Sequence, residues 1–217
     1  MPPRPELRVA GLVLAAGASR RFGSPKQLLP YGGGVLLDAA LETARTSGFD
    51  QIVLTLGGAS AEVRQTVDTH DLDVVENLDY DDGCSSSIAT AIPALHPQTD
   101  VLVLLLGDQP GVRPESVRRL LHGRGTSRIA VCRYENGIGH PFAFDRSVLP
   151  TLAALHGDKA VWKLLEHRAA ELVEVPVDGA IPLDVNTPAD YERVLALRGG
   201  SMLRAGSAWA ESPRSAR

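Results

Sequence analysis

Cysteine is scarce in this chain, and the little that is present forms no recognisable site. Cys84 and Cys132 are its two cysteines among 217 residues, and no CxxC pair occurs. A disulfide framework or a structural zinc site is therefore not expected, and a reducing cytosol is the natural setting. We accordingly predict a cytoplasmic protein.

Long apolar runs and an excess of positive charge are missing as well. No run approaches the ~20 apolar residues that span a bilayer. The apolar stretch from Val9 to Ala18 is interpreted as a buried strand that enters a turn rather than as a signal peptide. The formal net charge is −4, whereas proteins that wrap nucleic acid usually carry a basic excess. The sequence therefore predicts neither a membrane protein nor a nucleic-acid partner.

Two common phosphate-binding motifs are also absent. The sequence contains neither the Walker A pattern GxxxxGK[ST] nor the GxGxxG turn of dinucleotide-binding proteins. Any nucleotide site must therefore be built differently.

Apolar runs alternate with segments of helical periodicity through the first half of the chain. Strands are predicted at 9–15, 51–56, 72–75 and 101–106, and helices at 36–47, 59–68, 85–95 and 114–121. This alternation favours an α/β fold with a three-layer α/β/α Rossmann-like architecture and a mostly parallel sheet.

The second half of the chain is less regular. Strands at 129–134 and 141–144 are predicted to flank the segment 137–140, followed by a helix at 159–167, a strand at 172–176 and a last helix that ends near Leu197. We expect a single domain over 9–197, with flexible tails at 1–8 and 198–217.

Three polar segments follow predicted strands and carry the candidate chemistry. A glycine-containing loop after the first strand can present backbone N–H groups to phosphates, with Arg21 and Lys26 supplying positive charge. Asp108 follows the most apolar run of the chain and is suited to hold Mg²⁺ that bridges phosphates. Asp184 and Asn186 alternate by two, so they share a face of an extended segment and are further oxygen ligands for Mg²⁺.

The order of the motifs resembles a known family. The strand followed by LAAGxSxRxGxxKxLLP, the Gly-x-Ser-Ser-Ser turn, GDxP, GHP and a final DxxTPxDY pattern are similar to the molybdenum cofactor cytidylyltransferases, within the larger superfamily of guanylyltransferase-like and sugar-phosphate nucleotidyltransferases. The resemblance covers roughly residues 11 to 197. It implies a fold of the nucleotide-diphospho-sugar transferase type and transfer of CMP from CTP to molybdopterin with release of pyrophosphate.

The resemblance also assigns roles to residues. Leu14, Ala15, Ala16 and Gly17 would hold the base and ribose, Arg21 and Lys26 the phosphates, and Asp108 the Mg²⁺, completed by Asp184 or Asn186. Further residues near the substrates would be Gly83, Ser85 and Ser86 beside the base, and His140 in the acceptor pocket.

Two details of the pattern bear on specificity and metal binding. The cytidylyl branch has Ala-Ala-Gly where the guanylyl branch has a glycine pair, and a Cβ at Ala16 would narrow the base pocket in favour of a pyrimidine. The family commonly has a second acid where this chain has Asn186, so weaker metal affinity is expected.

Other functions stay open at this stage. The acceptor could instead be a sugar phosphate, a polyol phosphate or phospholactate. An NAD(P)H-dependent oxidoreductase is a second alternative, although the missing GxGxxG turn speaks against it. A third is a non-catalytic accessory protein that holds a pterin cofactor and docks to a molybdenum hydroxylase.

Overall fold

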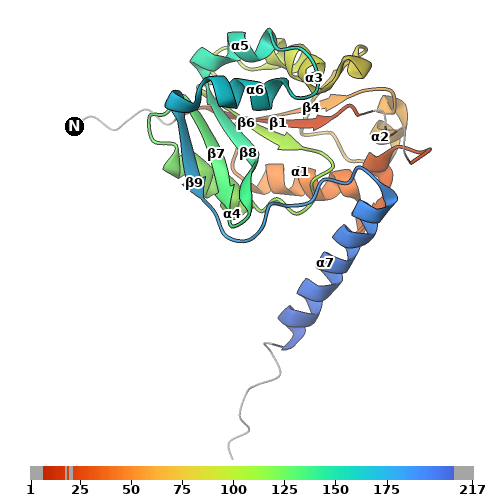
Figure 1. Ribbon diagram of the computed structural model, residues 1–217. Helices are drawn as coiled ribbons and strands as arrows, with labels where there is room; N and C mark the ends of the chain where they lie inside the picture. Colours follow the sequence, from red (N-terminus) through yellow and green to blue (C-terminus); the bar gives the residue numbers. More distant parts are fainter. Residues whose placement is uncertain (1–6, 18, 20–21, 208–217) are drawn as a thin grey trace, which may run out of the picture.

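The computed structural model describes residues 7–17, 19 and 22–207 (Figure 1). Within them, one sheet of seven strands has the order β5-β4-β1-β6-β8-β7-β9. The strands are β1 (Val9–Ala15), β4 (Gln51–Leu56), β5 (Asp73–Glu76), β6 (Val101–Leu106), β7 (Ile129–Tyr134), β8 (Gly137–Asp145) and β9 (Leu172–Pro176). A separate hairpin pairs β2 (Pro30–Tyr31) with β3 (Gly34–Val35).

Helices cover both faces of this sheet (Figure 1). The helices are α1 (Leu36–Thr46), α2 (Ser60–Thr66), α3 (Cys84–Ala91), α4 (Pro114–Gly123), α5 (Leu149–Ala153), α6 (Ala160–His167) and α7 (Pro188–Ser207). Buried residues of α1, α2 and α4 pack on one face, and those of α3, α5 and α6 on the other. The predicted three-layer α/β/α architecture is thus confirmed.

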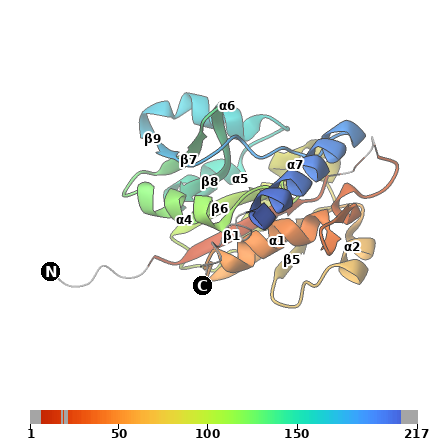
Figure 2. The same ribbon diagram turned by 90° about the horizontal axis from the view of Figure 1, so that it is seen from below.

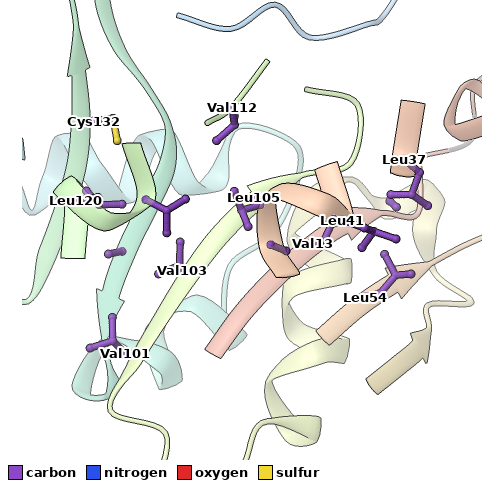
Figure 3. Close-up of a cluster of buried hydrophobic side chains, with 14 of the residues drawn as sticks. Val13, Leu37, Leu41, Leu54, Val101, Val103, Leu105, Val112, Leu120 and Cys132 are labelled. Carbon is purple, nitrogen blue, oxygen red and sulfur yellow. The ribbon is translucent and has the colours of Figure 1, made fainter. Parts of the chain in front are cut away.

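The central strands are apolar throughout because both of their faces are covered. Along β6, Val101, Val103 and Leu105 join the core on the α1 and α4 side, whereas Leu102 and Leu104 join the core on the opposite face. Figure 3 shows the first of these cores. Full burial of such a side chain contributes roughly 1.5–3 kcal/mol, so the two cores together stabilise the sheet from both sides.

The sheet is mostly parallel, as predicted, with β8 as the exception. Strands β1, β4, β5 and β6 pair in parallel, and so do β7 and β9, but β8 runs antiparallel to both β6 and β7. Strand β8 also begins at Gly137, so the segment 137–140 lies within the strand rather than before it. A Cβ on Gly139 would lie 2.8 Å from the side chain of Ile181, which fills the space above the strand.

Helix α7 leaves the body of the molecule at the end of the sheet where β1 finishes (Figures 1 and 2). It continues past the predicted end near Leu197 to Ser207. Its first turns dock on the β2–β3 hairpin, where Arg198 lies 5.2 Å from the ring centre of Tyr31. No helix within the described ranges is long and apolar enough to cross a membrane. The predicted domain limits of 9–197 remain a prediction.

Candidate active site

The loop after β1 is shaped by hydrogen bonds within itself. The buried side chain of Gln27 donates to the carbonyls of Ala15 (2.7 Å) and Gly17 (3.1 Å). Ser19, at a left-handed φ of 51°, accepts from the backbone N–H of Lys26 (2.9 Å). These contacts fold the loop back so that Lys26 lies at the carboxyl end of the sheet. The predicted phosphate ligand Arg21 lies outside the described residues.

Gln27 is a residue that sequence reasoning missed. A glutamine next to a lysine in a polar loop looks like a solvated side chain, but here it is 2% exposed. The signal that could have found it is the need to satisfy the carbonyls that a tight loop turns inward.

A cavity of about 370 Å³ opens beside this loop. It is lined by Gly17, Ser19, Gly23, Ser24, Pro25, Gly58, Ala59, Glu62 and Tyr80. The aromatic ring of Tyr80 lies against the turn after β4, where a Cβ on Gly58 would be 2.8 Å from its hydroxyl oxygen. Gly17 lines the cavity, while Ala16 is 4% exposed and is not among the lining residues that the structure describes. Their roles at the base and ribose stay predictions.

The serine-rich turn faces inward rather than into this cavity. Asn77, itself buried, donates from its amide to the hydroxyls of Ser86 (2.9 Å) and Ser87 (3.0 Å). Ser85 is 1% exposed, and Gly83 supplies the positive φ of 96° that lets the chain turn into α3. The contacts in the structure therefore give these residues a role in holding the turn.

Cys84 sits in the same turn and is not set up as a nucleophile. Its backbone N–H donates to the carboxylate of Asp158 (3.1 Å), and its thiol donates to the Asp158 carbonyl (2.9 Å). Burial, together with the negative charge of Asp158, raises the pKa of the thiol to about 11. The thiolate that a reactive cysteine needs is thus disfavoured.

The three predicted polar segments meet at one point. The ammonium of Lys26 forms an ion pair with Asp108 and donates to the amide oxygen of Asn186 (3.1 Å). The segment that carries Asp184 and Asn186 is fixed to the turn after β6, because the backbone N–H of Val185 donates to the Asp108 carbonyl (3.0 Å). Gln109 strengthens this link by donating to the carbonyl of Pro182 (2.7 Å).

Asp184 interacts electrostatically with Asp108 and Lys26 of this cluster. Desolvation by the surrounding protein raises the pKa of its carboxyl to about 6, and the neighbouring negative charge of Asp108 adds to this, whereas Lys26 opposes it. The side chain still reaches solvent. Two carboxylates that repel each other at an open site are stabilised by a cation between them.

The donor set fits a divalent cation that is shared with a substrate. Asp108 and Asp184 offer carboxylate oxygens and Asn186 an amide oxygen, and the Lys26 ammonium already occupies a cationic position between Asp108 and Asn186. Among the described residues, no group of three or more His, Cys, Asp or Glu side chains could hold a metal by itself. Mg²⁺ is typically held in this way, by one or two carboxylates plus substrate phosphates.

His140 lies elsewhere, on the α6 face of β8. It is 9% exposed and packs on Phe142, with ring centres 4.0 Å apart, rather than hydrogen bonding to Asp108, Asp184 or Asn186. Burial lowers the pKa of its imidazole to about 3, so the ring is neutral at physiological pH.

The MobA-like NTP transferase domain matches residues 11–173. The chain belongs to this MobA-like NTP transferase family. As a family member it is a nucleotidyltransferase, and the family indicates a nucleoside triphosphate as substrate.

Two curated members of the superfamily are similar over most of their length. Nicotine blue oxidoreductase of Paenarthrobacter nicotinovorans is 32% identical over 198 residues, covering 86% of this chain and 96% of its own. Molybdenum cofactor cytidylyltransferase of Escherichia coli K12 is 27% identical over 183 residues, covering 83% and 92%.

Solved structures agree with this membership. Rv0371c of Mycobacterium tuberculosis is 47% identical with a TM-score of 0.82, covering 88% of this chain and 98% of its own. A complex of Rv0371c with manganese is 46% identical with a TM-score of 0.80, covering 87% and 98%. A nucleotidyl transferase from Methanothermobacter is 26% identical with a TM-score of 0.75, covering 88% and 99%. The last-named Rv0371c structure shows that Rv0371c binds manganese.

Proposed function

We propose that this nucleotidyltransferase transfers CMP from CTP to molybdopterin or a related molybdenum cofactor, with a divalent metal, Mg²⁺ or Mn²⁺, and with release of pyrophosphate. The observation that carries the proposal is the meeting of Lys26, Asp108 and Asn186 beside a cavity lined by the glycine loop. Cation, carboxylate and backbone N–H groups are the groups that a triphosphate and its metal require. The likeness to molybdenum cofactor cytidylyltransferase supports this acceptor and this nucleotide.

Residues at different positions of the site would bind the nucleotide, its phosphates and the metal. Gly17 and Ser19 lie where the nucleotide would enter, with Tyr80 across the cavity. Lys26, and Arg21 from the same loop, would neutralise the phosphates. Asp108, Asp184 and Asn186 would hold the divalent metal, which when bound draws negative charge from the triphosphate.

The reaction requires little proton chemistry from the protein. An oxygen of the acceptor phosphate forms a bond to the α-phosphorus of CTP, and the bond from that phosphorus to the oxygen of the leaving pyrophosphate breaks. The acceptor phosphate is already ionised at neutral pH, so no general base is needed. Catalysis by this chain would therefore rest on positioning and charge neutralisation.

The test is pyrophosphate release. The full chain is supplied with each nucleoside triphosphate, Mg²⁺ or Mn²⁺, and molybdopterin, glucose 1-phosphate, a polyol phosphate or phospholactate as acceptor. We expect CTP with molybdopterin to give the highest kcat/KM. Asp108→Asn should lower kcat by about 10²-fold or more, whereas the exposed Asp68→Asn should not. Preference for GTP would overturn the cytidylyl assignment, and preference for a sugar phosphate would overturn the acceptor.

A second candidate function rests on the likeness to nicotine blue oxidoreductase. An NAD(P)H-dependent reductase would consume the reduced nicotinamide cofactor when nicotine blue is added, with no triphosphate present. The same purified protein is assayed for loss of absorbance at the NADH band. Turnover there, together with no pyrophosphate release from any triphosphate, would favour the oxidoreductase. Failure of both assays would favour the accessory protein that docks to a molybdenum hydroxylase.

A further inference from the structure

The segment that carries two of the three proposed metal ligands has no regular structure of its own. Residues 177–187 connect β9 to α7 without forming a helix or a strand, and Asp184 and Asn186 lie near the end of this connecting segment. Fixing the backbone of a flexible residue costs conformational entropy. The affinity for a metal therefore depends on how firmly neighbouring parts of the fold hold the connecting segment before the metal binds.

Gln109 holds the connecting segment from the turn after β6. It follows Asp108 in the chain, is 2% exposed, and donates from its amide to the carbonyl of Pro182 (2.7 Å), two residues before Asp184. The two backbones lie close together here, since a Cβ on Gly111 would be 3.1 Å from the side chain of Pro182. The turn thus carries one proposed ligand and holds the segment that carries the other two.

The same amide acts on the Asp184 side chain. Desolvation and the negative charge of Asp108 raise the pKa of Asp184 to about 6, and a hydrogen-bonding interaction with Gln109 is among the effects that oppose this rise. An amide nitrogen carries two hydrogens, so it can serve the Pro182 carbonyl and the Asp184 carboxylate together. The opposite orientation would turn the amide oxygen toward both of these acceptors and is disfavoured by repulsion.

Fold stability alone does not explain a glutamine at this position. Its Oε1 atom is buried and has no hydrogen-bond partner among the described residues. A buried acceptor without a partner destabilises the fold, and an apolar side chain of similar length would avoid that cost. The donor half of the Gln109 amide is used and the acceptor half is not, which points to the groups that receive its hydrogens.

We propose that Gln109 is a positioning residue of the metal site, which holds the Asp184 carboxylate in place for a divalent cation by donating to Pro182 and to Asp184 itself. The inference rests on the proposed function, because it takes Asp184 as a metal ligand. A carboxylate that is already in place binds a cation without first having to be ordered. Loss of the amide should therefore weaken metal binding.

The test is titration of the full chain with Mn²⁺, without nucleotide, followed by the electron paramagnetic resonance of the free ion. Gln109→Met keeps the length of the side chain and removes the amide. We expect the variant to raise the Kd for Mn²⁺ about tenfold, the effect of one lost hydrogen bond to a charged group. An unchanged Kd in the folded variant would overturn the proposal.

Gln51 provides a matched control for a purely structural effect. Its amide also donates to a carboxylate and a carbonyl, those of Asp73 (2.7 Å) and Ala94 (2.9 Å). It lies at the start of β4, at the opposite end of the sheet from Asp108. Gln51→Met should lower the urea midpoint and keep the wild-type Kd for Mn²⁺. Equal weakening of Mn²⁺ binding by Gln51→Met and Gln109→Met would show a general loss of stability and overturn the positioning role.

A double-mutant cycle tests whether Gln109 acts through Asp184. In an Asp184→Asn background the carboxylate that the amide holds is gone, so adding Gln109→Met should change the Kd for Mn²⁺ little further. The full effect of Gln109→Met persisting in that background would show that the residue does not act through Asp184 and would contradict the proposal.

Failure of this inference and failure of the proposed function give different results. If Asp108→Asn weakens Mn²⁺ binding while Gln109→Met does not, the metal site stands and the positioning role falls. If neither Asp108→Asn nor Asp184→Asn weakens Mn²⁺ binding, the metal site falls and the positioning role falls with it. If Gln109→Met weakens Mn²⁺ binding as expected but no acceptor supports pyrophosphate release, the positioning role stands and the transferase proposal falls.

Discussion

Replacement of Lys26 by methionine should change metal binding and nucleotide binding in opposite directions. The Lys26 ammonium pairs with Asp108 and donates to Asn186, which are also the proposed metal ligands. A divalent cation and an ammonium cannot occupy the same oxygens, so Lys26 competes with the metal until a triphosphate draws it away. Methionine has a similar length and no charge, so Lys26→Met removes the competitor and keeps most of the packing.

The size of both effects follows from the contacts. The Lys26 and Asp108 side chains are 13% and 18% exposed, so their interaction is only partly screened by water. A hydrogen bond to a charged group contributes about 1.5–3 kcal/mol, and 1.4 kcal/mol corresponds to a factor of about ten in affinity. Without nucleotide, the variant should therefore bind Mn²⁺ roughly 10- to 100-fold more tightly. Loss of the same ammonium from the triphosphate should weaken CTP binding by a similar factor.

The assay is titration of Mn²⁺ followed by the electron paramagnetic resonance of the free ion. It is run on wild type, Lys26→Met and the exposed control Lys163→Met, and CTP binding is measured by calorimetry on the same samples. The control should match wild type in both titrations. Equal or weaker Mn²⁺ binding by Lys26→Met would refute competition, and unchanged CTP affinity would refute the role of Lys26 at the phosphates.

Three further substitutions test the loop, the cavity and the buried His140. Gln27→Leu leaves the carbonyls of Ala15 and Gly17 without their donor, so the free energy of unfolding in urea should fall by about 1–3 kcal/mol; an unchanged urea midpoint would contradict this. Tyr80→Ala should weaken CTP binding by about 1–3 kcal/mol if the ring stacks on the base, while binding of inorganic tripolyphosphate should not change. The pKa of His140 falls from 6.5 to about 3 on folding, so the unfolded chain binds more protons between these values, and stability should decline as pH falls from 6.5 toward 3. His140→Phe should flatten that decline in urea midpoints taken from pH 4 to pH 7, and equal slopes for the two proteins would show that His140 is not its source.

The fold was largely predictable because its signals are local. The run from Val101 to Leu106 is apolar without interruption, and such a run is typical of a strand covered on both faces. The direction of β8 was not predictable in the same way, since its sequence does not encode which neighbour it pairs with. Its beginning at Gly137 was missed because glycines weaken a strand pattern, and Ile181, which covers them, lies more than 40 residues away in the chain.

The candidate site was predictable where a single residue carries a charge after a strand. Lys26, Asp108 and Asn186 were expected near one another, and the structure brings them into contact. The surroundings were harder to predict, because they depend on which way side chains turn. The Ser86 hydroxyl accepts a hydrogen bond from the Asn77 amide, and Trp162 is 40% exposed although its helix packs on the core. Neither fact is visible in residue spacing.

The antiparallel strand β8 has a consequence for the solubility of the chain during its synthesis. On one side it supplies the pairing partner of β6, whose other side pairs with β1. During synthesis β6 emerges before residues 137–145, so a nascent chain that has reached α4 presents an unpaired, wholly apolar strand edge. Such edges are sites of aggregation. Ribosome stalling or truncation between residues 107 and 136 should therefore yield insoluble fragments, and solubility should return once β8 has left the exit tunnel and closed that edge.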